Sequence, residues 1–433
     1  MKALRIINGR VIDPSTGEDG VRDVCVVDGK ISAEAPKDAE VIDAKGKAVT
    51  PGWIDLHVHL REPGQSAKET IATGTRAAAA GGFTSVVCMP NTQPALDNAG
   101  SISWVHEKAR RTGIVNVFVA GALTKGIAGE ELTPVGAMVS AGIVALTDDG
   151  HCIQNHEIMR RAVEYARMFN LPVFDHCQDY ALVGDGVMHE GEWSYRLGLP
   201  GWPRVGEELI VARNILLAEL CDHPIHCQHI SSGGSVRMLR EARARGIKIS
   251  GEACPHHVVL TDASLKGYDS RYKMNPPLRT QADIESILEG IADGTIDILC
   301  SDHAPHAAYE KERELGLAPF GITGLETEFG LFCNLLVHER KVIDFPRLIA
   351  LYTTQPARLL SLDRGTLAVG APADITICDP DLEWTYDREQ TESLSKNTPF
   401  HGWSMKGRAV QTIVGGRSVW TSGSGIQEPT THV

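Results

Sequence analysis

Short apolar, β-branched runs recur along the middle of the chain, and segments with helical spacing of apolar residues separate them. The runs are WIDLHVHL, TSVVCMPN, VNVFVAG, GIVALTDD, LPVFDHC, PIHCQHI, IKISGEACPHH and IDILCSDH. Segments such as NHEIMRRAVEYARMFN between them place apolar residues every three or four positions. Eight such alternations predict parallel strands with right-handed crossovers, and therefore an α/β fold with a (β/α)8 TIM-like barrel over residues 52–362. An open doubly wound sheet is the competing fold, but no GxGxxG follows the first run.

The flanking segments have a different pattern. Residues 1–51 and 363–433 contain short runs such as LRIINGRVID and ADITICDPD, which read as strands joined by turns. We expect the two segments to pair as a small, discontinuous β-sandwich domain with the barrel inserted between them. Residues 304–324 are charged and then rich in Gly and Pro, which suits a loop covering a site or an ordinary solvated connection.

Composition narrows the class of protein. The 433 residues are 42% hydrophobic and 22% charged, as in ordinary globular proteins, and the formal charge of −13 gives no basic surface for nucleic acid or an anionic membrane. No run approaches the ~18 apolar residues of a membrane span, and the N-terminus lacks the apolar stretch of a signal peptide. Ten cysteines without CxxC pairs indicate reduced thiols and a cytoplasmic protein.

Polar residues collect where the apolar runs end, which is the active-site face of such a barrel. On a strand, His57 and His59 point to the same side, an arrangement more natural for binding a metal than for packing. The residues at or just after the run ends are His57, His59, Asn91, Asp149, His176, His229, His256 and Asp302. Their four metal-type imidazoles (His57, His59, His176, His229) and two carboxylates can form a two-metal site if they converge.

Several motifs identify a resemblance. These motifs are PGWIDLHVHLREPG, GGFTSVVCMPNTQP, ALTDDG, EACPHH, KMNPPLR, SDHAPH, PFGITGLET and GAPADI. They are spread over nearly the whole chain. With them the chain resembles the amidohydrolase superfamily and, within it, the bacterial dihydroorotases of the longer type. HxH alone is a weak signal, whereas REPG, MPNT, NPPLR and GLET together are specific.

The resemblance implies one or two Zn²⁺ per chain, with two expected. One ion would be held by His57, His59 and Asp302, and a second by His176 and His229. Many relatives bridge the ions with a carbamylated lysine, but GIVALTDDG has none, and no lysine occurs between Lys125 and Lys248. The resemblance to the dihydroorotases of the longer type implies Asp149 as the bridging ligand, although Asp148 stands next to it.

The implied reaction is the reversible closure of N-carbamoyl-L-aspartate to L-dihydroorotate with loss of water, the third step of pyrimidine synthesis. A hydroxide bridging the metals would be the nucleophile, and Asp302 would act both as ligand and as general acid and base. Arg61 suits the substrate carboxylate, unless it is a solvated loop charge, and Asn91 can hydrogen-bond the same group. The residues expected to contact substrate are His59, Arg61, Asn91, Asn275, His306, Phe320 and Gly321.

Other residues receive structural roles. We expect His256 and His257 to be hydrogen-bonded within the fold, and His189 and Trp193 to pack in a loop. Two alternatives to the dihydroorotase reaction stay open. The first is another cyclic-amide hydrolase, of the hydantoinase or allantoinase type. The second is a non-catalytic scaffold for aspartate transcarbamoylase, which the complete ligand set disfavours. A homodimer, and an active enzyme that docks on the transcarbamoylase, also stay open.

Overall fold

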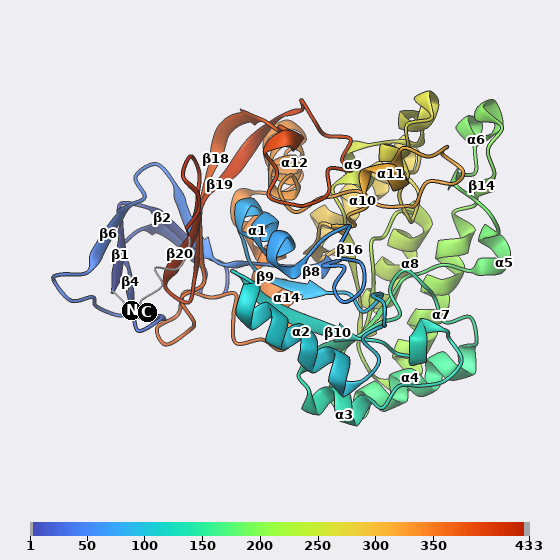
Figure 1. The fold of residues 1–433 in the computed structure, drawn as a ribbon, viewed down its shortest axis with the longest axis horizontal. Helices are drawn as coiled ribbons and strands as arrows, with labels where there is room; N and C mark the ends of the chain where they lie inside the picture. Colours follow the sequence, from blue (N-terminus) through green and yellow to red (C-terminus); the bar gives the residue numbers. More distant parts are fainter. Residues whose placement is uncertain (1–2, 428–433) are drawn as a thin grey trace.

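The computed structural model describes residues 3–427, and its largest part is a barrel beside a smaller all-β region (Figure 1). The predicted sandwich range includes residues 1–2 and 428–433, which lie outside the described residues.

A sheet of eight strands forms the barrel, and each neighbouring pair in it is parallel. Its strands, in chain order, are β8 (Trp53–Val58), β9 (Phe83–Cys88), β10 (Asn116–Gly121), β11 (Ile143–Leu146), β12 (Val173–Asp175), β15 (Ile225–Cys227), β16 (Ile249–Ala253) and β17 (Ile298–Leu299). His303, beyond β17, forms a parallel bridge with Val58 of β8, and the His59 backbone N–H donates to the His303 carbonyl at 2.9 Å. These contacts join the first and last strands. The predicted barrel and all eight predicted strands are confirmed.

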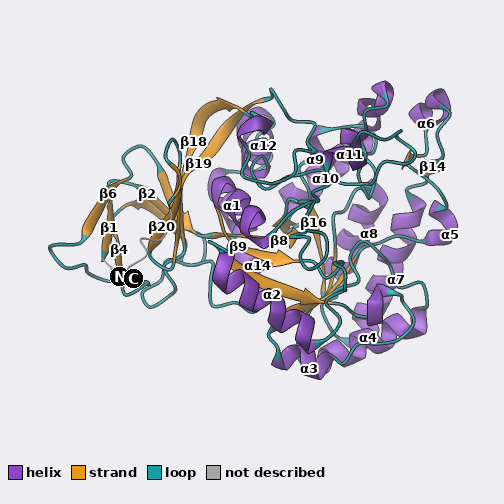
Figure 2. Cartoon of the chain, in the orientation of Figure 1, coloured by secondary structure: helices purple, strands orange, loops and turns teal. Residues whose placement is uncertain are grey.

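Helices surround this sheet (Figure 2). The main ones are α1 (Ile71–Gly81), α2 (Ala99–Thr112), α3 (Val135–Ser140), α4 (His156–Met168), α7 (Val205–Cys221), α8 (Gly233–Ala244), α10 (Gln281–Asp293) and α13 (Phe345–Tyr352). Polar caps explain where several of them begin, because Thr70, Asn155 and Ser232 accept hydrogen bonds from first-turn backbone N–H groups. Short helices α5 (Tyr180–Val183), α6 (Glu192–Leu197), α9 (His256–Val259), α11 (Ala308–Lys311), α12 (Glu328–Phe332) and α14 (Thr354–Leu359) lie in the longer connections.

Apolar side chains from six of the strands meet in one buried cluster. They are Ile54, Leu56, Val87, Ala120, Ala145, Phe174 and Ile298. Because the contributing strands follow one another around the sheet, this cluster fills the barrel interior. The polar residues of the strand ends therefore stand on a packed core and not over an open channel.

The flanking segments form two further sheets. One has the order β5-β4-β1-β6 and the other the order β21-β20-β19-β18-β7-β2-β3. Their strands are β1 (Leu4–Ile7), β2 (Arg10–Asp13), β3 (Glu18–Val21), β4 (Val24–Val27), β5 (Lys30–Ser32), β6 (Glu40–Asp43), β7 (Ala48–Pro51), β18 (Ile375–Thr385), β19 (Ser404–Val414), β20 (Arg417–Thr421) and β21 (Gly425–Ile426). β18 pairs with β7 across more than 300 residues of sequence, and Val11, Val26, Val49, Ile375 and Ile413 share one core. The predicted sandwich of N- and C-terminal segments is confirmed.

The domain boundaries themselves stay a prediction. β18 and β19 continue beyond the sandwich toward α12 on the barrel (Figure 1). In the segment that joins these two strands, the Asn397 side chain donates to the Ala304 carbonyl at 3.0 Å, and the His306 backbone N–H donates to Asn397 at 2.9 Å. Part of the range assigned to the sandwich therefore contacts the barrel where β17 ends.

Two global expectations can be compared with the fold. All ten cysteines are free and buried, in agreement with reduced thiols that pack as small apolar groups. Within residues 3–427, no helix has the length and apolarity that crossing a bilayer requires.

Candidate metal centre and substrate pocket

Six buried side chains converge at the carboxyl ends of the barrel strands. His57 is on β8 and His59 follows it, while Asp149 follows β11, His176 follows β12, His229 follows β15 and Asp302 follows β17. Each is at most 6% exposed. Because parallel strands deliver their carboxyl ends to one face, residues 245 positions apart in the sequence become neighbours. All six predicted metal-binding residues are brought together, and their roles as ligands stay a prediction.

The distances within this cluster suit metal ligands. Asp149 Oδ1 lies 3.1 Å from His57 Nε2 and 3.7 Å from His176 Nδ1. Asp302 Oδ1 lies 3.1 Å from His59 Nε2 and 3.5 Å from His57 Nε2. Three groups have their potential ligand atoms within 4.8 Å of one another: His57, His59 and Asp149; Asp149, His176 and His229; and His57, His229 and Asp302. His57, Asp149 and His229 each belong to two of the groups, and of these three only Asp149 is a carboxylate, whose two oxygens could bind different ions.

The neighbouring carboxylate, Asp148, has a different environment. Its Oδ1 accepts hydrogen bonds from the Leu123 and Thr124 backbone N–H groups at 2.8 and 3.0 Å. Burial raises the pKa of Asp148 to about 6. Asp148 thus caps the backbone after β10, and it is Asp149 that faces the imidazoles.

The remaining imidazole nitrogens are oriented by other side chains. His57 Nδ1 lies 2.7 Å from Glu252 Oε1, His59 Nδ1 lies 2.9 Å from Asn91 Oδ1, and His176 Nε2 lies 3.0 Å from Gln178 Oε1. Such contacts fix the ring and direct the opposite nitrogen into the cluster, where a metal could bind it. Our sequence reasoning missed Glu252 and Gln178. The signals available were the first position of EACPHH and the second residue after His176, and neither is distinctive by itself.

The buried charges and unpartnered nitrogens of the cluster indicate whether a divalent cation would fit there. Asp149, Asp302 and Glu252 are all buried, and His57 Nε2 and His229 Nδ1 have no hydrogen-bond partner among the described residues. Burial would raise the pKa of Asp149, but the nearby His57 holds it well below its usual range. Burial, together with His176 and His57, lowers the pKa of His229 to about 3. Buried carboxylates beside buried imidazoles form an oxygen and nitrogen donor set that a divalent cation satisfies.

The backbone is left-handed at three of the predicted site residues. The φ angles are +59° at Arg61, +32° at His229 and +44° at Asp302. Non-glycine residues seldom adopt this conformation, which costs on the order of 1–3 kcal/mol. Strain of this kind concentrates at functional sites, where the surrounding structure holds it in place.

A pocket of about 290 Å³ opens above the cluster, and we call it the mouth pocket. Its lining includes all the predicted site residues except His57: His59, Arg61, Asn91, Asp149, His176, His229, Asn275, Asp302, His306, Phe320 and Gly321. Gly150, Met274, Ala304 and Pro319 also line it and were not predicted. Each of the four is next to a predicted residue or close to one in sequence, so the motifs marked the right segments but not every member.

One wall of the mouth pocket carries a buried guanidinium. Arg61 is 8% exposed, and its Nε donates to the Pro305 carbonyl at 3.1 Å. No carboxylate of the described residues lies within 4.0 Å of it, and burial lowers its pKa to about 10. Burial and Arg61 lower the pKa of the adjacent His306 to about 2, so that its imidazole is neutral. A buried, unpaired cation in a pocket is suited to a substrate anion.

Loops form other parts of the lining. The Asn275 side chain donates to Gln178 at 3.2 Å, and its Oδ1 is buried without a partner in the described part of the chain. Gly321 has a φ of +144°, and a Cβ there would lie 2.7 Å from the Ala304 carbonyl oxygen. Only glycine fits at this position, which explains the PFG sequence.

The residues with predicted structural roles differ in the hydrogen bonds and packing contacts that they make. His257 Nε2 lies 2.9 Å from the Pro276 carbonyl, as expected, but His256 Nε2 is buried and has no hydrogen-bond partner within residues 3–427. His189 accepts from Arg279 at 3.2 Å, and Trp193 packs against an apolar cluster in the same region.

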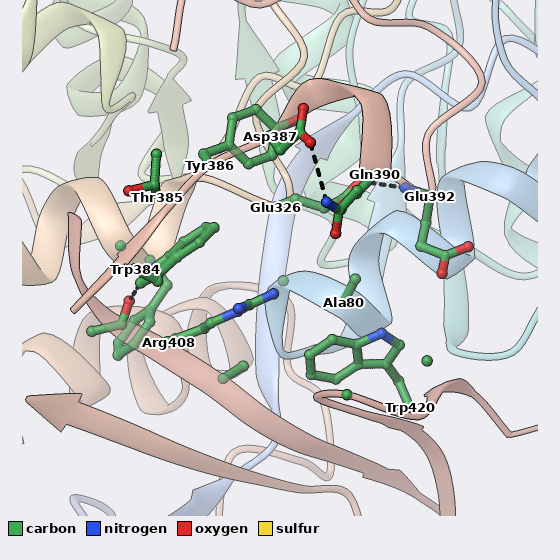
Figure 3. A pocket seen from close by; sticks show the side chains of 17 residues that line it. Ala80, Glu326, Trp384, Thr385, Tyr386, Asp387, Gln390, Glu392, Arg408 and Trp420 are labelled. Atoms are coloured by element: carbon green, nitrogen blue, oxygen red, sulfur yellow. Dashed lines mark hydrogen bonds between the residues drawn. The ribbon is translucent and has the colours of Figure 1, made fainter. Parts of the chain in front are cut away.

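A second cavity, of about 300 Å³, lies between the outer parts of β18 and β19 and helices α1 and α12 (Figure 3). We call it the side cavity. Its lining includes Ala80, Glu326, Trp384, Tyr386, Arg408 and Trp420. Glu326 accepts hydrogen bonds from the Thr391 hydroxyl and from the Glu392 and Ser393 backbone N–H groups. The Arg408 guanidinium lies 4.6 Å from the Trp384 ring centre.

Comparisons with known families agree with this geometry. The family model described as dihydro-orotase-like matches residues 46–235, and the amidohydrolase family model matches residues 221–420. Among solved structures, the L-hydantoinase (dihydropyrimidinase) of Arthrobacter aurescens superposes with a TM-score of 0.87, covering 99% of this chain and 98% of that one at 23% identity. The dihydropyrimidinase of Brevibacillus agri NCHU1002 gives a TM-score of 0.84 at 25% identity, with 96% of this chain and 95% of that one covered. These structures establish the shared fold.

Curated relatives are considerably closer in sequence. A dihydroorotase of Geobacter sp. strain M21 is 50% identical over 97% of this chain and 100% of its own length. A dihydroorotase of Solibacter usitatus is 49% identical over 96% of this chain and 97% of its own length. Identity at this level over whole chains settles the family, so the chain belongs to the dihydroorotases within the amidohydrolases.

Proposed function

We propose that this chain is a zinc-dependent dihydroorotase, which interconverts N-carbamoyl-L-aspartate and L-dihydroorotate in the third step of pyrimidine synthesis. The observation that carries the proposal is the Asp149 carboxylate, which groups both with His57 and His59 and with His176 and His229 as potential metal ligands, in the same pocket as the buried, unpaired Arg61. Dihydroorotate offers that pocket a carboxylate and a cyclic amide.

His57, His59 and Asp302 would hold one zinc ion, His176 and His229 a second, and Asp149 would bridge them. Zinc bound there supplies Lewis acidity at the substrate carbonyl and makes water nucleophilic near neutral pH. The ligand set is that of borderline cations, with imidazole nitrogens and carboxylate oxygens.

Proton transfer is assigned to Asp302. Its Oδ1 faces His59 and His57, and its side chain lines the mouth pocket. Oδ2 is then the atom that takes a proton from the attacking water and returns it to the leaving ring nitrogen. Burial would raise the pKa of Asp302, but His57 and His59 hold it below its usual value, so the carboxylate starts as a base.

Substrate orientation is assigned to the walls of the mouth pocket. Arg61 would pair with the substrate carboxylate through two N–H groups, with Asn91, Asn275 and the neutral His306 completing its hydrogen bonds. Phe320 and the Gly321 backbone would close over the ring and exclude water. His59 would contact the substrate as well as the metal.

The cysteines support our proposal for the cell compartment. Ten unpaired, buried thiols suit a reducing environment, and we place the enzyme in the cytoplasm.

The test is hydrolysis of dihydroorotate by the purified protein, followed by absorbance, with metal content determined on the same sample. We expect turnover that chelation removes and zinc restores. A metal-loaded protein that hydrolyses hydantoin, allantoin or dihydrouracil instead would contradict the substrate. A metal-free protein that zinc cannot activate would favour a scaffold role.

A further inference from the structure

The loop that follows α11 over the mouth pocket has an unusual support. We call residues 312–321 the rim loop, and its last three residues, Pro319, Phe320 and Gly321, line the pocket. The rim loop contains neither helix nor strand, and Leu317 at its middle is 61% exposed. Something other than secondary structure must therefore fix the position of Phe320 and Gly321.

Two buried lysines supply that support. Lys273 Nζ donates to the carbonyls of Leu315, Gly316 and Ala318 at 2.7, 3.1 and 2.7 Å. Lys311 Nζ donates to the carbonyls of Pro319 and Gly321 at 2.9 and 3.0 Å, and to the Lys273 carbonyl at 3.4 Å. Each amine thus makes three hydrogen bonds, the full number an ammonium can donate.

The same lysines connect the rim loop to the segment that carries Asn275. Lys273 immediately precedes Met274 and Asn275, which line the mouth pocket, and its carbonyl accepts from the Gly321 backbone N–H at 2.9 Å. Lys273 Nζ also lies 4.5 Å from the centre of the Phe320 ring, within the range of a cation–π contact. A displacement of either lysine would therefore move both of these pocket-lining segments.

This arrangement is costly for the fold. Lys273 is 3% exposed and Lys311 is 6% exposed, and within the described residues neither amine has a carboxylate within 4.0 Å. Burial lowers the pKa of Lys273 to about 8, and burial together with Lys273 lowers that of Lys311 to about 7. Buried lysines are rare unless paired, because desolvating an ammonium is unfavourable. The two amines are stabilised here by the carbonyls of the rim loop and of Lys273, and Lys273 also by the Phe320 ring.

We propose that Lys273 and Lys311 are positioning residues, which hold the rim loop so that Phe320 and Gly321 are already in place when substrate enters the mouth pocket. The inference rests on the proposed function for the identity of the substrate. Neither lysine touches the metal-ligand cluster, so the effect is on substrate binding and not on metal content.

Three variants and a control test it: Lys273→Met, Lys311→Met, Lys273→Arg and the exposed, nearby Lys266→Met. Hydrogen exchange by mass spectrometry on residues 312–321 is measured without substrate, alongside zinc content, KM and kcat for dihydroorotate. For each buried Met variant we expect exchange faster by about tenfold or more and a KM raised about tenfold. Zinc content should stay unchanged, and kcat should change less than KM. Lys273→Arg, which keeps charged donors, should recover most of both losses, and Lys266→Met should match the parent.

Two outcomes would overturn the inference. One is a zinc-loaded Met variant whose exchange and KM both equal those of the parent. The other is faster exchange with an unchanged KM, because the lysines would then serve the fold alone. If the Met variants do not fold, hydrogen exchange in the parent protein tests the inference instead. Rim-loop amides of the parent that exchange as fast as those of an unstructured peptide would show that the loop is not held in place. Exchange needs no substrate, so a parent inactive on dihydroorotate would contradict the proposed function without deciding this point.

Discussion

The mouth pocket and the side cavity have nearly the same volume, about 290 and 300 Å³, yet their polar groups are arranged differently. In the side cavity, Glu326 accepts backbone hydrogen bonds and the Trp384 indole donates to the Gly407 carbonyl at 2.9 Å. In the mouth pocket, Asn275 Oδ1, His229 Nδ1 and His306 Nδ1 are buried without hydrogen-bond partners in the described chain. A fold leaves such atoms unpaired at a cost, and three of them gathered at one pocket favour ligand binding there more than the volume of the cavity does.

The largest expected effect comes from Asp302→Asn. It removes the group assigned to proton transfer, and we expect kcat to fall by about 10⁴-fold in both directions. Steady-state rates with dihydroorotate and with carbamoyl aspartate measure it. The matched control is Asp387→Asn at the side cavity, which should keep parental kinetics. Substantial activity in Asp302→Asn would remove this residue from the acid/base role.

Next in size is the effect of Asp149→Asn on metal binding. Loss of an orienting partner of a ligand costs 10- to 100-fold in metal affinity, and loss of a ligand shared by two ions should cost more, on the order of 10³-fold. Competition with a zinc chelator measures the affinity. Asp148→Asn, one residue earlier, should leave it unchanged. Equal affinities for the two variants would show that Asp149 does not bridge the ions.

Arg61→Met tests the substrate anion site. Loss of a buried, charge-assisted pair should weaken carboxylate binding by about 2–4 kcal/mol, which is a roughly 30- to 900-fold rise in KM. Arg408→Met makes the same change in the side cavity, where we expect no change in KM. If Arg61→Met also has the parental KM, the carboxylate is held elsewhere.

The smallest expected effect concerns stability and the side cavity. Burial raises the pKa of Glu326 from 4.5 to about 7, so the folded state binds a proton more tightly than the unfolded state does. This contribution to stability is complete below pH 4.5 and is lost as pH rises toward 7, at about 1 kcal/mol per pH unit at most. Glu326→Gln should remove it and leave the kinetics unchanged.

Denaturant unfolding at several pH values compares this variant with the parent. Their stabilities should diverge between pH 4.5 and 7, with the parent losing more. Parallel curves would mean that the carboxyl group does not titrate in this window. A change in kcat or KM of the Glu326→Gln variant would contradict the expectation that the side cavity takes no part in catalysis.

The sequence predicted the barrel and the convergence of the metal-type residues, because both depend on local patterns. Alternating periodicity defined the strands, and His57, Asp149 and Asp302 each follow from their position at a strand end. The contacts of Glu252, Lys273 and Asn397 could not be predicted in this way. A glutamate on a strand, a lysine before NPP and an asparagine in a polar segment have no distinctive spacing, and their partners lie 195, 42 and 91 residues away.

Asn397 has a consequence for how the protein can be divided. It comes after the barrel in the chain, yet its side chain donates to the carbonyls of Ala304 and Gly321, and it accepts from the backbone of His306. A gene fragment ending at residue 362 would encode every proposed zinc ligand and still lack this clamp on the pocket rim. The barrel alone therefore lacks part of the structure that supports its active-site pocket. A chimera of two relatives would have to take the pocket rim and the C-terminal segment from the same parent.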